Sequence, residues 1–461
     1  MTDLLDGEVT APGTDVAALA ARFPPGFSWG VASSAYQIEG AVAEDGRGPS
    51  IWDTFSHTPD RTANGETGDI ACDHYHRWAE DVELMASLGV TAYRLSISWP
   101  RVMPAGRGAP NEAGIGFYDR LVDRLLERGI EPVVTLYHWD LPQALQDRGG
   151  WTNPAIVEWF ADYAGLVADR LGDRVRSWVT INEPQCFAFM GHGSGEHAPG
   201  LHDWAAALVA SSAAITAHWA ATARIRESAT DPRIGIALDL NHVEPASPRE
   251  ADVEAARRHQ AIRQSWFLDP LFGRGYPDLA IAAHREVGHL PSLPSPPTPG
   301  VLDFLGLNYY TRETVTADST APFGLRLASR DGVPSTTMGW EVYPDGLRQV
   351  LLRLQRDYAP TAIVVTENGA AFVDGIGGGA IADPRRRDFF AGHLAAAAEA
   401  IEAGVPLTGF HAWSLLDNFE WAKGYGQRFG LVGVDYDTQR RTPKASAAWY
   451  RDLLAAHRNG R

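Results

Sequence analysis

Short apolar runs recur along the chain, and longer stretches with apolar positions at helical spacing separate them. Eight such runs occupy residues 28–34, 92–98, 132–137, 178–182, 234–240, 304–310, 362–366 and 407–415. Runs that are apolar throughout are typical of strands buried on both faces, as in parallel sheets. Because strands that alternate with helices pair in parallel, the pattern predicts an α/β fold. Eight units predict a single closed (β/α)8 TIM barrel.

The stretch after the third run shows how clear the helical signals are. Its apolar positions at helical spacing are Ile156, Phe160, Ala164, Val167 and Leu171. Asn153 can cap this helix, Pro154 suits its first position, and Gly172 supplies a stop. The same spacing predicts helices around 78–85 and 117–125, which end before Gly89 and Gly129.

A doubly wound open sheet is the alternative for alternating strands and helices. It would normally carry a G-x-G-x-x-G turn after its first strand, and none follows residues 28–34. The closed barrel is therefore favoured.

The 461 residues exceed the usual size of one domain, but barrels with insertions reach more than about 400 residues. We expect one catalytic domain over residues 23–461 and a loosely ordered lead-in over residues 1–22. The lead-in is acidic and lacks the basic start and apolar centre of a signal peptide, and no 18-residue apolar stretch is present. These features predict a cytoplasmic protein. The net charge of −17 argues against nucleic acid and anionic membranes as partners.

Three irregular stretches are interpreted as loops. Residues 291–299 are rich in proline and serine, lie between the fifth and sixth runs, and are expected at the surface. Residues 312–344 follow the sixth run and are long enough to shape a substrate cleft. The glycine cluster 375–379 is expected to be a flexible loop, because no Lys-Ser/Thr pair of a phosphate-binding loop follows it.

Two glutamates end apolar runs in similar contexts, in Asn182-Glu183-Pro184 and Thr366-Glu367-Asn368-Gly369. The carboxyl end of a barrel strand is where catalytic side chains are placed. Two such carboxyl groups facing each other across the barrel mouth would suit glycoside hydrolysis. The alternative for any single glutamate is a surface position in a loop. Cys186, close to Glu183, either fills space or lines the site.

Side chains that suit sugar hydroxyls and sugar ring faces stand at other strand ends. They are Gln37, Glu39, Arg94, His138, Trp139, Asn308, Tyr310, Trp413, Glu420 and Trp421, with Lys423 in the last loop. No H-E-x-x-H motif predicts a metal, no nucleotide-binding loop predicts a cofactor, and no G-x-S-x-G turn predicts a serine hydrolase. We therefore expect neither a metal nor a cofactor.

With these motifs the chain resembles the retaining β-glycosidases of glycoside hydrolase family 1, of β-glucosidase type. The resemblance runs from about residue 23 to about residue 454 and includes the amino-terminal signature at 27–41. It implies that Glu367 is the nucleophile and Glu183 the acid/base. It also implies that Arg94 and Tyr310 hold the nucleophile ionised, that Asn182 binds the sugar 2-hydroxyl, and that Asn308 supports the pair. The implied substrate-binding residues are Gln37, His138, Trp139, Asn182, Trp340, Trp413, Glu420, Trp421 and Phe429.

The implied activity is hydrolysis of terminal β-D-glucosyl residues, with β-galactosides and β-fucosides as further substrates and transglycosylation as a side reaction. Small oligosaccharides or aryl and alkyl β-glycosides would be the substrates. Many family members carry tryptophan where Gln185 stands, so we expect a more polar and wider mouth on the leaving-group side. A non-catalytic sugar-binding barrel, a phospho-sugar hydrolase and a transglycosylase are the alternatives.

Overall fold

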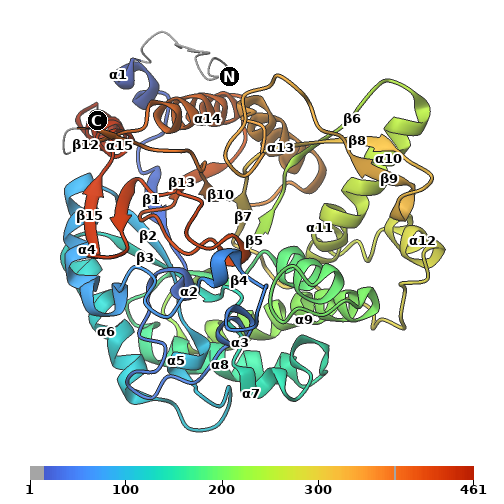
Figure 1. The fold of residues 1–461 in the computed structure, drawn as a ribbon, viewed down its shortest axis with the longest axis horizontal. Coiled ribbons are helices and arrows are strands. Elements are labelled where there is room, and N and C mark those ends of the chain that lie inside the picture. The colour runs from blue at the N-terminus through green and yellow to red at the C-terminus, as the bar shows by residue number, and fades with distance from the viewer. Residues whose placement is uncertain (1–14, 378–379, 461) are drawn as a thin grey trace.

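The computed structural model describes residues 15–377 and 380–460, in which a closed barrel of eight parallel strands is surrounded by helices (Figure 1). The barrel strands are β1 (Ser28–Ala32), β2 (Ala92–Ser96), β3 (Glu131–Tyr137), β4 (Ser177–Asn182), β5 (Arg233–Asp239), β7 (Phe304–Asn308), β10 (Ile363–Asn368) and β13 (Leu407–Trp413). They pair in this order and β13 closes onto β1. Each strand coincides with one of the eight apolar runs, so the predicted (β/α)8 barrel is confirmed.

Helices join each barrel strand to the next and cover the outside of the barrel (Figure 1). The longer ones are α4 (His74–Leu88), α6 (Glu112–Glu127), α8 (Ile156–Leu171), α9 (Trp204–Ser228), α10 (Glu250–Gln260), α12 (Asp278–Glu286), α13 (Pro344–Tyr358), α14 (Pro384–Glu402) and α15 (Ala445–Asn459). The short ones are α1 (Val16–Ala20), α2 (Ala35–Ile38), α3 (Ile51–Ser56), α5 (Trp99–Val102), α7 (Gln143–Gln146) and α11 (Trp266–Leu271). Two segments are π-helical. The first, η3 (Cys186–Ser194), follows β4, and the second, η4 (Ala261–Ser265), lies between α10 and α11.

Helix α8 lies where its sequence predicts, but it begins at Ile156, two residues after the expected first position, Pro154. The Asn153 side chain accepts a hydrogen bond from the Ala155 N–H at 2.9 Å, and Gly172 follows the last helical residue. Its apolar stripe is buried, with Ile156 and Phe160 at 0% exposure. Burial of the apolar stripe therefore confirms the helix, whereas Asn153 stabilises the turn that precedes it.

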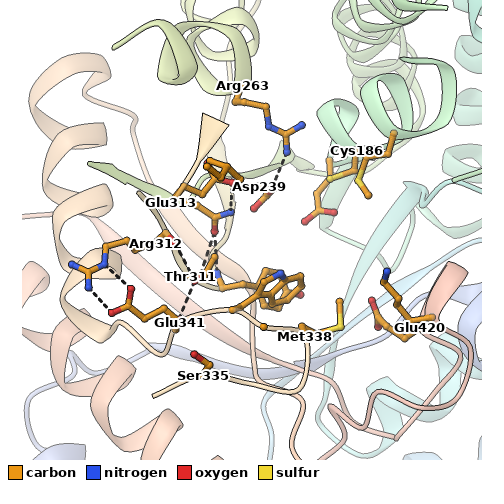
Figure 2. Close-up of a pocket in the computed structure, with 18 of the residues that line it drawn as sticks. Cys186, Asp239, Arg263, Thr311, Arg312, Glu313, Ser335, Met338, Glu341 and Glu420 are labelled. Carbon is orange, nitrogen blue, oxygen red and sulfur yellow. Dashed lines mark hydrogen bonds and ion pairs between the residues drawn. The ribbon is translucent and has the colours of Figure 1, made fainter. Parts of the chain in front are cut away.

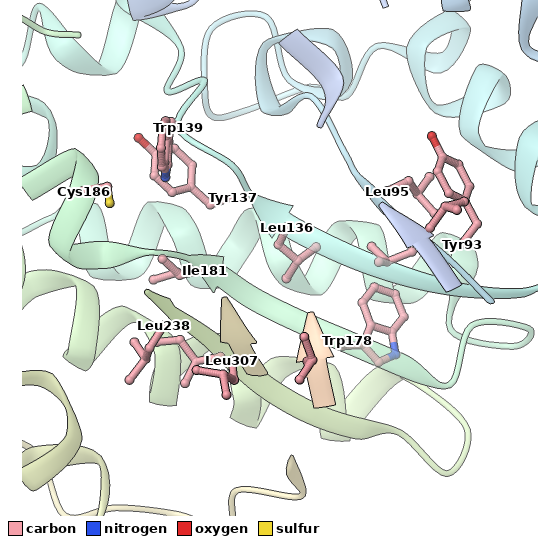
Figure 3. Packing of buried hydrophobic residues seen from close by; sticks show 14 of the residues in the cluster. Tyr93, Leu95, Leu136, Tyr137, Trp139, Trp178, Ile181, Cys186, Leu238 and Leu307 are labelled. Carbon is pink, nitrogen blue, oxygen red and sulfur yellow. The ribbon is translucent and has the colours of Figure 1, made fainter. Parts of the chain in front are cut away.

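Side chains alternate between the barrel interior and the surrounding helices. Ala92, Val133, Val179, Ala237 and Phe304 form a small apolar cluster of their own. Residues an odd number of positions further along the same strands, among them Leu136, Leu238 and Leu307, belong to the main core beneath the helices (Figure 3). Since side chains alternate with a period of two, the interior positions further along are Arg94, Thr135, Asp239 and Asn308. The apolar floor thus gives way to polar groups toward the carboxyl ends.

The structure differs from expectation in three connecting segments. Within residues 312–344, β8 (Arg312–Ala317) and β9 (Leu325–Leu327) form a sheet with β6 (His242–Pro245). The glycine-rich stretch expected as a plain loop contributes β11 (Gly375–Gly377), which pairs with β12 (Ala380–Ala382). These strands are short or polar on both faces, so periodicity does not reveal them. A further hairpin, β14 (Val432–Asp435) with β15 (Arg440–Pro443), follows the last barrel strand.

The packed part of the chain begins before the boundary expected at residue 23. Helix α1 lies against α15, and its Leu19 and Ala20 are buried in the main core. The Asp15 side chain caps α1 by accepting from the N–H groups of Ala17 and Ala18. Residues 15–22 of the expected lead-in therefore belong to the folded domain. Its residues 1–14 lie outside the described part of the chain.

Helix α9 is long and apolar enough by composition to cross a membrane. Most of that apolar window is buried inside the fold, where α9 packs against α8. Its hydropathy is that of a buried helix in the layer around the barrel.

Candidate active site

A cavity of about 720 Å³ lies at the carboxyl ends of the barrel strands (Figure 2). Both candidate catalytic glutamates line it. The other predicted site residues in its lining are His138, Trp139, Tyr310, Trp340, Trp413, Glu420, Trp421 and Phe429. The strand-end rule therefore brings together side chains that lie far apart in sequence.

Glu367, near the carboxyl end of β10, is held by two donors. Arg94 on β2 forms an ion pair with one carboxylate oxygen, and the Tyr310 hydroxyl donates to the other at 2.6 Å. Burial and the neighbouring charge of Glu367 raise the pKa of Tyr310 well above its ordinary value, so the phenol keeps the proton that it donates. With 3% exposure, the Glu367 carboxylate is fixed in orientation toward the cavity.

Arg94 is itself fixed on all sides. It donates to the Thr135 hydroxyl at 3.1 Å, to the Thr366 carbonyl at 3.3 Å and to the Asn182 side-chain oxygen at 2.6 Å. It is 1% exposed. A buried guanidinium with all these partners is a rigid positive charge beside Glu367.

Glu183 follows the end of β4 in a different environment. Its φ of 46° is in the left-handed region, which a glutamate rarely adopts, and its N–H donates to the Ala237 carbonyl at 2.8 Å. Burial, together with the negative charges of Glu367 and Asp239, raises the pKa of Glu183 well above its ordinary value. The side chain accepts one hydrogen bond, from Asn308 at 2.7 Å. Glu183 is thus kept as a protonated acid, and its strained backbone is typical of a functional position.

Asn182 and Asn308 connect the two carboxyl groups. Asn308 lies beside Glu367 in the register of β7 with β10, and it donates to both Asn182 and Glu183. The Asn182 oxygen accepts from Arg94 and Asn308, so its NH₂ group must face His138, whose Nε2 lies 3.1 Å away. Burial and the Arg94 charge hold the pKa of His138 well below its usual value. The neutral imidazole therefore accepts at Nε2 and carries its proton on Nδ1.

This assignment leaves donors for a ligand. Nδ1 of His138 is buried and has no partner within residues 15–377 and 380–460. The second N–H of the Asn182 amide is likewise unused by those residues. Buried donors are nearly always paired in the working state of a protein, so we expect substrate hydroxyls to pair with them.

Aromatic rings form one side of the cavity. The Trp421 ring lies 4.6 Å from that of Trp139, and the His138 ring stacks on Trp413 at 5.8 Å. Trp139 donates its indole N–H to the Asn182 carbonyl at 3.0 Å. Trp139 and Trp421 both have positive φ, at 79° and 48°. Such rings supply the flat apolar surface that the C–H face of a sugar requires.

Glu420 places a further carboxyl group in the cavity lining, beside these rings. Burial and the Glu367 charge raise the pKa of Glu420 to about 8. One of its oxygens is buried and has no partner in the described part of the chain. A neutral carboxyl can both donate to and accept from sugar hydroxyls.

The structure places two glutamines away from the cavity lining. Gln37 is fully buried, donates to Asn418 and the Phe419 carbonyl, and accepts from Ser34. Its role in substrate binding stays a prediction. The expectation that Gln185 makes the mouth more polar is wrong, because Gln185 is 1% exposed and donates to the Asp239 carbonyl at 2.6 Å.

Glu39, a strand-end candidate, is also not in this cavity. Its carboxylate pairs with Arg101 at 2.8 Å and accepts from the Tyr118 hydroxyl at 2.6 Å.

Cys186 lines the cavity near Glu183, where burial raises the pKa of its thiol well above the usual value.

Sequence reasoning missed a group of charged side chains on the Glu183 side of the cavity. They are Asp239, Arg263 and Glu313, from β5, η4 and β8 (Figure 2). The strand-end rule could have found Asp239, because the fifth apolar run ends beside it. Nothing in the periodicity singles out Arg263 or Glu313.

Within residues 15–377 and 380–460, no group of three or more His, Cys, Asp or Glu side chains could hold a metal ion. The chemistry available is that of two carboxyl groups, one held by an arginine and a phenol, the other protonated. At the mouth of a TIM barrel with aromatic walls, this pair defines a glycoside hydrolase.

The comparisons with known proteins agree. A family model described as Glycosyl hydrolase family 1 matches residues 19–459, so the chain belongs to this family. Beta-glucosidase A of Thermotoga maritima is 47% identical over 438 residues, which cover 94% of this chain and 98% of that protein. A bifunctional beta-D-glucosidase/beta-D-fucosidase of Bifidobacterium breve is 44% identical over 468 residues, which cover 94% of this chain and 98% of that protein.

A similar solved structure is that of the Thermotoga maritima family 1 glycoside hydrolase complexed with a cyclophellitol analogue transition state mimic. Its TM-score to this chain is 0.90 at 46% identity, with 94% of this chain and 98% of that chain covered. Fold, site and relatives identify the chain as a glycoside hydrolase.

Proposed function

We propose that the chain is a retaining β-glucosidase that hydrolyses terminal non-reducing β-D-glucosyl residues through a covalent glycosyl-enzyme. The observation that carries the proposal is the unequal environment of the two carboxyl groups. Arg94 and Tyr310 orient Glu367 as a carboxylate, whereas burial and neighbouring charges keep the proton on Glu183. A nucleophile and an acid need these opposite states.

In the first step, a Glu367 oxygen attacks the anomeric carbon while the bond to the leaving-group oxygen breaks. Glu183 gives its proton to that oxygen, so the leaving group departs as a neutral alcohol. In the second step, Glu183, now ionised, takes a proton from water. The water oxygen attacks the anomeric carbon, the ester to Glu367 breaks, and the sugar leaves with its configuration retained.

The sugar itself would lie against Trp413 and Trp421. The unused donors of His138 and Asn182 and the neutral carboxyl of Glu420 would pair with its hydroxyls. A hydrogen bond from Asn182 to the 2-hydroxyl would strengthen as charge develops on the ring. Trp340 and Phe429, whose rings lie 6.1 Å apart, would contact the leaving group.

Activity on β-fucosides is supported by the name of the Bifidobacterium relative. Activity on β-galactosides, transglycosylation to added alcohols and a cytoplasmic location are further proposals. Independence of metals and cofactors stays a prediction, which dialysis against a chelator would test.

The first measurement follows the product by NMR during early turnover of an aryl β-glucoside. We expect β-glucose to form first and to mutarotate later, because two displacements retain configuration. First-formed α-glucose would refute the retaining mechanism, and an absence of turnover on every β-glucoside would refute the proposed activity.

The same assay with 6-phospho-β-glucoside tests the phospho-sugar alternative. A phosphate would bring further negative charge into a cavity that already holds the Glu367 carboxylate, and Lys423 is already within 3.7 Å of Glu196. Unmatched like charges in a binding site cost several kcal/mol, so we expect kcat/KM to favour the unphosphorylated glucoside at least about a hundredfold. Equal values would assign the enzyme to the phospho-sugar branch.

The pH profile of kcat/KM should fall on its alkaline side as Glu183 loses its proton. Because the pKa of Glu183 is raised, this limb should lie well above the ordinary range of a glutamate. The limb belongs to a coupled group of carboxyls, since Asp239, with a pKa of about 7, lies close by. Glu183→Gln, measured on an activated aryl glucoside, should abolish the limb. An unchanged limb would contradict the acid assignment.

A further inference from the structure

The turn that carries Glu420 and Trp421 has an uncommon backbone. The Glu420 N–H donates to the Gly424 carbonyl at 2.7 Å, and Trp421 has a φ of 48°. Gly424 has a φ of 61° and a ψ of −141°, a combination that is open to glycine and unfavourable for other residues. Such conformations persist only where the surrounding structure enforces them, so contacts from outside the turn must hold it.

Glu66 supplies such a contact from the loop between α3 and α4. Its carboxylate accepts a hydrogen bond at 2.6 Å from the N–H of Tyr425, the residue after the turn. A Cβ added at Gly424 would lie 1.9 Å from the same oxygen, so the carboxylate lies directly against the turn. The other carboxylate oxygen receives a long hydrogen bond of 3.4 Å from Asn64. The main partner of the Glu66 side chain is therefore the end of the turn.

The loop that carries Glu66 is itself fixed. The Thr62 hydroxyl donates to the Glu66 carbonyl at 2.7 Å, and the Glu66 N–H donates to the Ala63 carbonyl at 3.1 Å. The Tyr425 hydroxyl donates to the Thr67 carbonyl at 2.7 Å. Tyr425 is thus held at its backbone by one residue of the loop and at its ring hydroxyl by the next. The loop provides a fixed support for the turn.

Trp421 and Glu420 depend on this support to different extents. The Trp421 ring lies 4.5 Å from that of Trp52 and 4.6 Å from that of Trp139, so neighbouring rings fix its place. The Glu420 carboxyl lines the cavity and has one buried oxygen without a partner among the described residues. Its direction is therefore set by the backbone of the turn. Loss of the support would displace Glu420 more readily than Trp421.

We infer that Glu66 is a positioning residue, which holds the turn so that the Glu420 carboxyl faces the sugar. The inference rests on the proposed β-glucosidase activity and adds to it a residue that acts through Glu420. Glu66 lies outside the cavity lining, so it acts without contact to the substrate. A displacement of about 1 Å in a group that positions the substrate can cost about a hundredfold in rate. A side chain of another loop thus determines how well Glu420 pairs with the sugar hydroxyls.

Three substitutions at Glu66 separate contact from charge. Glu66→Ala removes the acceptor, Glu66→Asp keeps the charge but shortens the reach by one carbon, and Glu66→Gln keeps the length and an acceptor oxygen. We expect kcat/KM on an aryl β-glucoside to fall about tenfold or more in the first two and less than about threefold in the third. Unchanged activity in Glu66→Ala would contradict the inference. So would an impaired Glu66→Gln beside an active Glu66→Asp, because activity would then follow the charge.

Asp69→Ala is the matched control. Asp69 lies on the same loop and pairs with His57 at 3.1 Å. This substitution should leave kcat/KM unchanged. A loss as large as that in Glu66→Ala would count against the inference, because it would show that any change in the loop has the same effect.

A double-mutant cycle with Glu420→Ala tests the route of the effect. If Glu66 acts through the Glu420 carboxyl, Glu66→Ala should change kcat/KM by less than about twofold once that carboxyl is absent. A general structural role would lower kcat/KM by the same factor in both backgrounds and would overturn the inference. Glu66→Asp repeats the cycle if the melting temperature shows that Glu66→Ala does not fold. Absence of wild-type turnover on β-glucosides would instead refute the proposed function.

Discussion

Glu367→Ala will abolish hydrolysis, and we expect kcat to fall by about a millionfold, as when another covalent hydrolase loses its nucleophile. Without the carboxylate no glycosyl-enzyme can form, and water would have to attack in a site shaped for an ester. The measurement is release of glucose from an aryl β-glucoside at high enzyme concentration. External azide should restore turnover by attacking from the vacated side, and the product should then be the α-glycosyl azide.

This variant leaves Arg94 buried without its ion-pair partner, so lost activity must be separated from lost stability. Glu367→Gln keeps the shape of the side chain and provides that comparison. Glu39→Gln is the matched control, because Glu39 is also held by one arginine and one tyrosine but lies outside the cavity. We expect both Gln variants to lower the melting temperature and Glu367→Gln alone to lose activity. Comparable activity losses in the two would mean that stability explains the effect.

The barrel and the position of Glu183 and Glu367 at one mouth were predictable, because each strand is buried on both faces and each glutamate lies at the carboxyl end of such a strand. Buried parallel strands have to be apolar throughout, and the barrel closes their carboxyl ends into one ring. Glu183 and Glu367 therefore had to lie at one mouth. The small sheet of β6, β8 and β9 was missed because its strands are largely polar and half-exposed. No apolar run marks them.

The direction of individual side chains was the second feature that the sequence did not predict. Gln37 and Gln185 were both expected to face the substrate, yet both are turned into the protein, where each donates to a backbone carbonyl. The local backbone decides such directions, and at Glu183 the backbone is left-handed. Arg263 shows the converse case. It reaches the cavity from a π-helical segment, where helical spacing no longer predicts which face a side chain occupies.

Glu183→Ala should fail differently from Glu367→Ala, and the contrast is the sharpest test of the two roles. Alkyl glucosides and disaccharides need a proton on the departing oxygen, so their kcat/KM should fall by about 10²–10⁴-fold. A dinitrophenyl glucoside needs little protonation, and its first step should be nearly unaffected. Its second step should become slow, because no base remains to activate water. A burst of dinitrophenol followed by slow turnover is therefore expected.

Azide should relieve that slow step, because it attacks without needing a base. Removal of the Glu183 side chain leaves space beside Asn308 and next to Asp239, from which the anion can approach the face opposite Glu367. Attack there inverts the glycosyl-enzyme and gives the β-glycosyl azide, the opposite anomer to that from Glu367→Ala. Product anomers identified by NMR from the two variants thus assign both residues in one experiment. An α-azide from Glu183→Ala would show that the nucleophile and the acid/base had been exchanged, while a β-azide fixes Glu183 on the leaving-group side of the sugar, where Asp239 and Arg263 lie.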